Sequence, residues 1–195
     1  MKGDTLIVFA RAPRLGTVKR RLAASVGAMA ALRFYRGQLG RLLREAGRDR
    51  RWRTELAVTP DRIRWPVRAP PGLPMRPQGG GDLGRRMGRA LARHRRAVLV
   101  GCDIPGLGRA DIAAAFRALG RADAVFGPAE DGGYWLVGLG PRRPPAPFAG
   151  VRWSGEHALA DTLANCRGRR VALLRRLRDV DTAADLAAVS ARRRT

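Results

Sequence analysis

The sequence predicts an α/β domain built around a mainly parallel central sheet, and two observations lead to that prediction. Short apolar runs alternate with segments of helical periodicity along nearly the whole chain, as strands and their connecting helices do in such a sheet. Several of the apolar runs are continuous, which is typical of strands that are buried on both faces. The chain has 195 residues and no segment that reads as a linker, so we expect a single domain over residues 1–195.

The first part of the chain predicts two strands and a long helical segment between them. The run TLIVFA predicts a strand over Thr5–Ala10, which the loop ARAPRLGT follows. The chain turns helical from Val18, and apolar residues at helical spacing continue to Ala46. Thr54–Val58 predicts a second strand, after which a segment rich in proline and glycine has room for at most a short strand around Met75.

The central part of the chain predicts a capped helix, a strand and a second helix. Asp82 is placed to cap a helix whose apolar stripe includes Met87. Ala97–Gly101 is apolar throughout and predicts a central strand. Ile112 and Phe116 lie four residues apart on the apolar stripe of the helix that follows.

The last part of the chain predicts three more strands and two helices. Ala122–Phe126 and Tyr134–Leu139 are strands on either side of the turn GPAEDGG, and Val171–Leu174 is the final strand. Ser154 is placed to cap a helix in front of that strand. The segment Thr182–Asp185 has the T-x-x-D spacing of a capping box, which opens a final helix.

Polar side chains gather where the predicted strands end, and this is the edge at which α/β sheets bind ligands. These positions hold Arg11, Gly16, Lys19, Arg20 and Arg21 after the first strand, Gln78, Gly80, Asp82 and Arg86 after the third, Asp103 after the fourth, Glu130, Asp131, Gly132 and Gly133 after the fifth, and Asp179 and Asp181 after the last. Acidic residues are scarce in this chain, so their collection at one edge indicates a site.

Four of these residues carry the sharpest chemical hypotheses. Asp103 and Asp181 could hold Mg²⁺, which proteins bind through one or two carboxylates together with substrate phosphates. Asp103 could instead cap a turn, and Asp181 could instead be a partner of the capping box. Lys19 is one of only two lysines among 39 basic residues, and its compact ammonium could bind a phosphate. Gln78 could read a nucleobase edge or could be an exposed glutamine.

Composition narrows the classes of partner. The formal net charge is +23, but nearly all of it comes from scattered arginines with few aromatic residues between them, which does not resemble a nucleic-acid interface. No apolar run approaches the roughly 20 residues of a membrane span, and no secretory signal opens the chain. We therefore expect a cytoplasmic protein whose partners are small molecules rather than nucleic acid or membranes.

Six motifs in this order resemble a bacterial family within the GT-A superfamily of nucleotide-diphospho-sugar transferases. They are FARAPRLGTVKRRLA, QGGGDLGRRM, VGCDIPGL, GPAEDGGYWLVGL, RWSGEHAL and RDVDTAADL, and together they span nearly the whole chain. Members of that family are labelled glycosyltransferase or radical-SAM/selenodomain-associated transferase, and the superfamily includes molybdenum cofactor guanylyltransferases and CMP-Kdo synthetases. The resemblance implies a Rossmann-like, three-layer GT-A fold.

The resemblance also implies a role for each group of residues. Asp103 matches the superfamily's metal-binding aspartate, and Asp181 resembles the second metal aspartate of the CMP-Kdo synthetases. The resemblance places the nucleotide and its phosphates at Arg11, Gly16, Lys19, Arg21, Gln78, Gly80 and Asp82. It places the acceptor at Asp131, Gly132, Gly133 and Trp153. The expected catalytic residues are Asp103, Lys19 and Asp131, with Mg²⁺ or Mn²⁺ as the cofactor.

Three functions remain open from the sequence. Nucleotidyl transfer from a nucleoside triphosphate to a phosphorylated small molecule is favoured, because a domain of this size leaves little room for a separate acceptor module. Sugar transfer from a nucleotide-sugar is the second possibility. The third is a module that binds nucleotides or nucleic acid and catalyses nothing.

Overall fold

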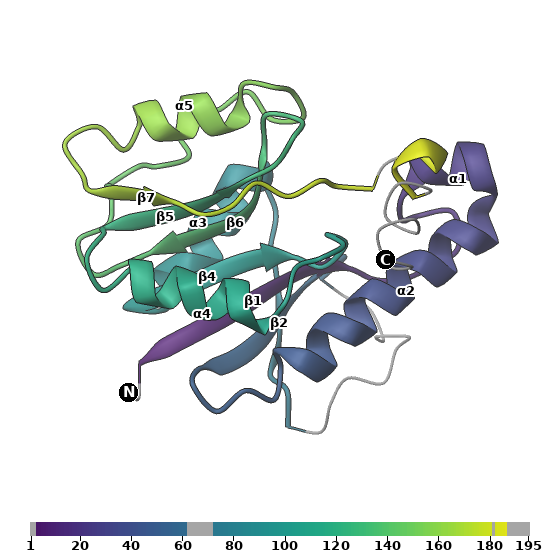
Figure 1. Ribbon diagram of the computed structural model, residues 1–195, viewed down its shortest axis with the longest axis horizontal. Coiled ribbons are helices and arrows are strands. Elements are labelled where there is room, and N and C mark those ends of the chain that lie inside the picture. Colours follow the sequence, from purple (N-terminus) through teal and green to yellow (C-terminus); the bar gives the residue numbers. More distant parts are fainter. Residues whose placement is uncertain (1–2, 62–71, 181, 187–195) are drawn as a thin grey trace.

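A computed structural model describes residues 3–61, 72–180 and 182–186 of the chain. Its centre is a seven-stranded sheet with the strand order β3-β2-β1-β4-β6-β5-β7 (Figure 1). The strands are β1 (Asp4–Arg11), β2 (Arg53–Thr59), β3 (Met75–Pro77), β4 (Arg96–Gly101), β5 (Ala124–Pro128), β6 (Tyr134–Leu139) and β7 (Val171–Leu173). Among the strands of the described residues, only β6 runs antiparallel to its neighbours, and a short turn joins it to β5; the other pairs are parallel. The predicted α/β class and mainly parallel sheet are confirmed.

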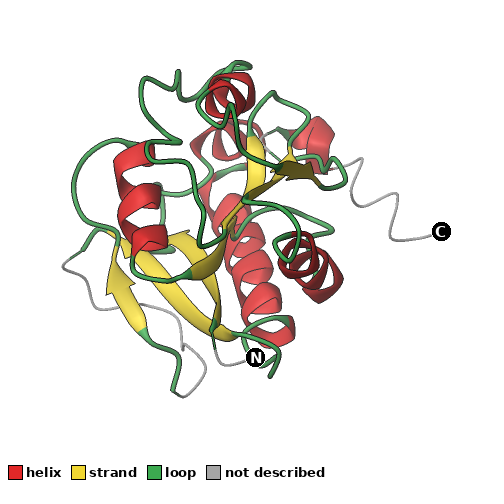
Figure 2. Ribbon diagram, turned by 90° about the vertical axis from the view of Figure 1, so that its left-hand side faces the viewer, coloured by secondary structure: helices red, strands yellow, loops and turns green. Residues whose placement is uncertain are grey.

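Helices cover both faces of this sheet (Figure 2). The helices are α1 (Arg20–Val26), α2 (Ala28–Glu45), α3 (Leu83–Ala92), α4 (Arg109–Ala118) and α5 (Ala158–Ala164). One apolar core joins α2 and α4 to one face of the strands, and a second joins α3 and α5 to the other face. Leu6 and Val8 of β1 point into the first core and Ile7 into the second, which explains why the run TLIVFA is apolar without alternation. The result is a three-layer fold.

Two helix starts are confirmed as the sequence predicts them. The Asp82 carboxylate caps α3 by accepting a hydrogen bond from the Arg85 N–H at 2.7 Å. The capping box forms as well: the Thr182 N–H donates to Asp185 Oδ2 at 2.9 Å, and the Asp185 N–H donates to Thr182 Oγ1 at 3.2 Å.

The cap expected at Ser154 is wrong, because α5 begins four residues later at Ala158. Ser154 has a left-handed backbone with φ 67°, and the residues up to His157 form turns. The N–H of Leu159 in the first turn of α5 donates to the Gly132 carbonyl at 3.0 Å. The start of α5 is therefore set by the turn between β5 and β6, a contact between distant segments that no local capping pattern contains.

The long helical segment expected from Val18 is divided in two. Gly27 adopts φ 85° between α1 and α2, a left-handed value that a glycine tolerates at little cost. The break turns α1 away from α2 at the carboxyl edge of β1, where α1 lies beside the segment that follows β7 (Figure 1). None of the described helices is both long and apolar enough to cross a membrane.

Candidate active site

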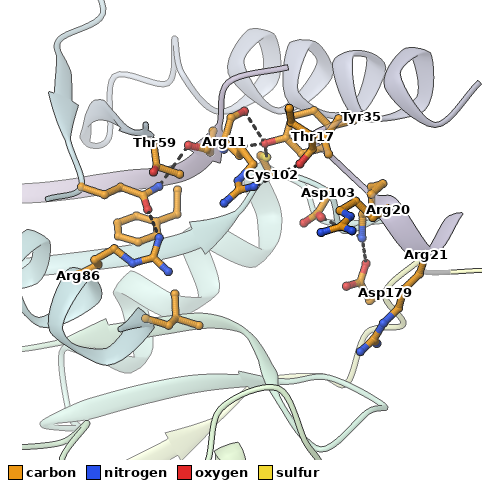
Figure 3. Close-up of a pocket in the computed structure, with 16 residues that line it drawn as sticks. Arg11, Thr17, Arg20, Arg21, Tyr35, Thr59, Arg86, Cys102, Asp103 and Asp179 are labelled. Carbon is orange, nitrogen blue, oxygen red and sulfur yellow. Dashed lines mark hydrogen bonds and ion pairs between the residues drawn. The ribbon is translucent and has the colours of Figure 1, made fainter. Parts of the chain in front are cut away.

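A cavity of about 490 Å³ lies at the carboxyl edge of β1, β2 and β4 (Figure 3). Segments that are distant in sequence meet there, among them the loop after β1, α2, the start of α3, the residues after β4 and the segment after β7. The lining consists of Phe9, Ala10, Arg11, Thr17, Val18, Lys19, Arg20, Arg21, Tyr35, Thr59, Gln78, Leu83, Arg86, Cys102, Asp103 and Asp179. The cavity is thus rich in arginine and has two aspartates on one side.

Lys19 forms the electrostatic centre of this cavity. Its Nζ lies 2.9 Å from Asp103 Oδ2 and 2.9 Å from Asp179 Oδ1, and its side chain is only 5% exposed. Burial by itself would lower the pKa of Lys19, but the two carboxylates outweigh it and hold that pKa above its usual value. Lys19 is therefore a fixed cation that joins the loop after β1 to the ends of β4 and β7.

The backbone of Lys19 is unusual, since it has φ 46° and ψ 52° at the N-terminus of α1. A non-glycine residue in this left-handed region costs on the order of 1 kcal/mol. The two ion pairs offset that cost, so the strained backbone and the buried ammonium belong to one arrangement.

The segment after β7 delivers Asp179 to the cavity by crossing the edge of the sheet towards α1 (Figure 1). Arg175 fixes the start of this segment through two hydrogen bonds to the Asp111 carboxylate, at 2.6 and 2.9 Å. Val180 fixes its end, because its side chain is fully buried against Leu22. Asp179 lies between these anchor points, and its position is set by tertiary contacts.

Tyr35 of α2 ties together two walls of the cavity. Its hydroxyl accepts a hydrogen bond from the Arg11 N–H at 2.8 Å and donates to the Arg11 carbonyl at 2.9 Å, while the Cys102 thiol donates to it at 3.1 Å. Burial raises the pKa of Tyr35 and also that of Cys102. Cys102 is therefore a buried thiol whose hydrogen is directed at the Tyr35 hydroxyl.

Gln78 is buried rather than exposed, and its side-chain amide is occupied by the protein. Its Nε2 donates to the carbonyls of Ala10 and Ala57 at 3.2 and 3.0 Å. Its Oε1 accepts a hydrogen bond from Arg86 Nη1 at 2.9 Å. Gln78 therefore locks the ends of β1 and β2 together and orients Arg86 at the cavity wall.

The structure brings some of the predicted nucleotide-side residues together and not others. Those that line the cavity are Arg11, Lys19, Arg21 and Gln78, and the predicted metal ligand Asp103 lines it with them. Those that lie outside the lining are Gly16, Gly80 and Asp82. Asp82 serves as the cap of α3, and the Gly80 carbonyl accepts a hydrogen bond from Arg89 at 3.0 Å. Asp181 falls outside the described residues.

The predicted acceptor-side residues occupy the same edge of the sheet but not the lining of this cavity. The Asp131 carboxylate accepts a hydrogen bond from the Gly133 N–H at 2.9 Å within the exposed turn between β5 and β6. Gly132 has φ 83° and lies against the backbone of Glu156. Trp153 packs on Phe148 and α3. An acceptor role for these residues stays a prediction.

Four cavity residues had no role predicted from the sequence: Arg20, Tyr35, Arg86 and Asp179. Asp179 and Arg86 follow predicted strands, which is the one local signal they carry. The family resemblance favoured Asp181 over Asp179, and only the three-dimensional path of the chain brings Asp179 to Lys19.

Asp103 and Asp179 have the chemistry to hold a divalent cation together with substrate phosphates. Within residues 3–61, 72–180 and 182–186, no three His, Cys, Asp or Glu side chains gather into a complete metal cage. Mg²⁺ is commonly held by only one or two carboxylates, with phosphates and water completing its shell. Two carboxylates that flank one cation in an arginine-lined cavity fit that mode of binding.

Comparisons with known proteins relate the chain to one bacterial family and to several solved structures. The model of a family described as an uncharacterized protein conserved in bacteria (DUF2064) matches residues 42–155. A structure described as a candidate nucleotide-diphospho-sugar transferase from Desulfovibrio desulfuricans G20 has 30% sequence identity and a TM-score of 0.89, over 97% of this chain and 87% of that chain. The search of curated proteins finds no match.

Two more distant structures share the fold alone. Rv0371c from Mycobacterium tuberculosis H37Rv, in complex with manganese, has a TM-score of 0.54 and 18% identity over 96% of this chain and 97% of that chain. The 2-C-methyl-D-erythritol 4-phosphate cytidylyltransferase of Thermus thermophilus has a TM-score of 0.53 and 18% identity, with each chain fully covered. The expected GT-A-like fold is confirmed by these matches.

Proposed function

Because the chain belongs to the bacterial DUF2064 family and shares its fold with nucleotide-diphospho-sugar transferases and nucleotidyltransferases, we propose that it is a divalent-metal-dependent transferase that acts on a nucleotide. The observation that carries the proposal is the buried ammonium of Lys19 between Asp103 and Asp179, inside a cavity that Arg11, Arg20 and Arg21 also line. Basic side chains of this density suit a polyphosphate.

The favoured reaction is nucleotidyl transfer. A phosphate oxygen of the acceptor attacks the α-phosphorus of a nucleoside triphosphate, the new P–O bond forms, and the bond to the β-phosphate breaks as pyrophosphate leaves. The attacking phosphate is already ionised at neutral pH, so the step needs positioning and charge neutralisation more than a general base. This fits a cavity lined by cations and without an ionised thiol.

Each part of the cavity has a role in this reaction. Asp103 and Asp179 would hold the divalent ion, which supplies charge neutralisation to the phosphates when bound. Arg11, Arg20 and Arg21 would bind phosphate oxygens. Lys19 keeps the two aspartates from repelling each other and maintains their spacing. Tyr35 acts as a positioning residue through the backbone of Arg11.

Sugar transfer from a nucleotide-sugar is the second candidate, and the description of the relative with 30% identity supports it. The two reactions release different products, so they can be separated directly. Nucleotidyl transfer releases pyrophosphate, whereas glycosyl transfer releases a nucleoside diphosphate. Assays of both products across a panel of nucleotides and phosphorylated or hydroxylated acceptors distinguish the two.

The test of the proposal compares Asp103→Asn and Asp179→Asn with a matched control, Asp49→Asn. Asp49 pairs with Arg51 just before β2, at the opposite edge of the sheet. Both site variants should lower metal-dependent turnover by roughly 100-fold or more, as removal of a group that stabilises the transition state does, and the control should leave it unchanged. Nucleotide binding without turnover by the wild-type protein, unaffected by Mg²⁺ or Mn²⁺, would establish a binding module and refute the proposal.

A further inference from the structure

Arg86 occupies the side of the cavity that faces away from the two aspartates (Figure 3). It is half-buried on α3, and the protein fixes its guanidinium at two points. Nη1 donates to Gln78 Oε1 at 2.9 Å, and Nε donates to the Asp82 carbonyl at 3.3 Å. Gln78 is itself only 4% exposed and hydrogen-bonded to two strands, so the guanidinium is held by a rigid support.

This anchoring leaves part of the guanidinium for a ligand. Nη2 makes no hydrogen bond within the part of the chain that the structure describes, and Nη1 has a second N–H beyond the one that Gln78 accepts. A guanidinium contains donors only, arranged in a planar fork. The group that meets this fork must therefore present two neighbouring acceptors.

The surroundings of Arg86 suit a flat ring better than a phosphate. Leu83 lies one helical turn before Arg86, lines the same cavity and is 36% exposed, which gives an apolar surface for a ring to cover. Arg20 and Arg21 lie on the other side, beside the aspartates (Figure 3). Lys19 pairs with those aspartates at 2.9 Å. A nucleotide whose phosphates bound there would have its nucleobase on the Arg86 side of the same cavity.

We propose that Arg86 is the residue that selects the nucleobase, and that the substrate is a guanine or cytosine nucleotide. Guanine presents O6 and N7 as neighbouring acceptors, and an arginine fork binds this pair in two-point fashion. Cytosine presents O2 and N3 in the same way. Adenine offers a donor beside each ring acceptor of its exposed edges, and uracil carries an N–H between its two carbonyls. The inference rests on the proposed function and specifies its substrate class.

The test measures the affinity of the protein for nucleoside di- and triphosphates of all four bases, in excess Mg²⁺ and without an acceptor. The guanine or the cytosine nucleotides should bind roughly tenfold more tightly than those of adenine and uracil, or better, as expected for one two-point contact. 7-Deazaguanine nucleotides lack the N7 acceptor. They should bind more weakly than guanine nucleotides if guanine is the base that Arg86 recognises.

Arg86→Lys and its neighbour Arg85→Lys form a matched pair of variants. Arg85 is exposed on the same helix and lies outside the cavity lining. Arg86→Lys keeps the charge but removes the fork, so the preferred base should lose about tenfold in affinity while the other bases change little. Arg85→Lys should preserve the preference. Thermal melting checks that both variants are folded.

Each outcome decides the proposal. Equal binding of all four bases by the wild-type protein, or an equal loss for all four in Arg86→Lys, would overturn base selection by Arg86 and leave the proposed function standing. The absence of binding for every nucleotide would overturn both.

Discussion

Replacement of Lys19 by methionine tests the arrangement on which the site depends. The variant keeps the apolar stem and removes the charge between Asp103 and Asp179. At 2.9 Å and an effective dielectric constant of about 20, each ion pair gains about 6 kcal/mol of attraction before desolvation. Loss of one partner of a buried pair costs about 3–5 kcal/mol in net stability. Each aspartate side chain is still 28% exposed, so we expect the lower end of that range, about 3 kcal/mol.

Urea unfolding at neutral pH in the presence of a chelator measures this loss of unfolding free energy. With a slope of about 2–3 kcal/mol per molar urea, the midpoint should fall by about 1 M or more. Arg20→Met is the matched control, because Arg20 is the next residue, lines the same cavity and is exposed. The free energy of unfolding of this control should change by less than about 0.5 kcal/mol.

A double-mutant cycle shows whether the loss comes from the ion pairs. Asp179→Asn removes one of the two carboxylates that Lys19→Met leaves without a cation, so the double variant should be more stable than the sum of the single effects by at least about 1 kcal/mol. Additive effects, or a Lys19→Met midpoint that matches the control, would refute the reasoning. Lys19→Arg should restore only part of the stability, because a planar fork does not fit a site shaped for a point charge.

Three further predictions address other parts of the molecule. Gly132→Ala should lower the unfolding free energy by about 3 kcal/mol in urea titrations, because φ is 83° and the added Cβ would overlap the backbone of Glu156. Cys102 and Cys166 are free and buried, and burial raises the pKa of both thiols. A thiol reagent at a pH of about 8, near the ordinary pKa of a thiol, should therefore label both cysteines only when the protein unfolds. Hydrogen bonds from Arg152 hold the pKa of Asp161 below its ordinary value of 3.8. The ionised Asp161 therefore stabilises the fold above pH 3.8, and this stabilisation is lost as the pH falls through the lower pKa of the folded protein. The melting temperature of Asp161→Asn should be below that of the wild-type protein at neutral pH and should converge with it in acid.

The fold was predictable from the sequence because its signals are local. Continuous apolar runs encode strands that are covered on both faces, and the predicted strand Tyr134–Leu139 agrees with β6 residue for residue. The cap at Asp82 and the box at Thr182 also depend on residues three apart. The helix start at Ala158 was not predictable, because the N–H of Leu159 bonds to the carbonyl of Gly132, far earlier in the chain.

The location of the site at the carboxyl edge of the sheet was predictable from the sequence, but the contacts between its residues were not. Strand ends identified Asp103 and the basic loop after β1, since parallel strands bring their carboxyl ends to one side. The arrival of Asp179 at the cavity depends on the path of the segment after β7, which the Arg175–Asp111 pair and buried Val180 fix. Burial of Gln78 depends in the same way on the register of β1 and β2, which no local pattern contains.

The presence of a lysine at position 19, in a chain that otherwise uses arginine, has a physical explanation. Arginine is used almost everywhere else, so composition alone would supply an arginine at this position too. Two carboxylates that approach one nitrogen at 2.9 Å need a compact charge whose three donors can point in different directions. A guanidinium would present its donors in one plane and would require more volume between β4 and the segment after β7. The exception in composition therefore marks a cation that is held between two acids at the cavity wall. It separates a residue that holds the site together from the arginines that we propose to bind phosphate.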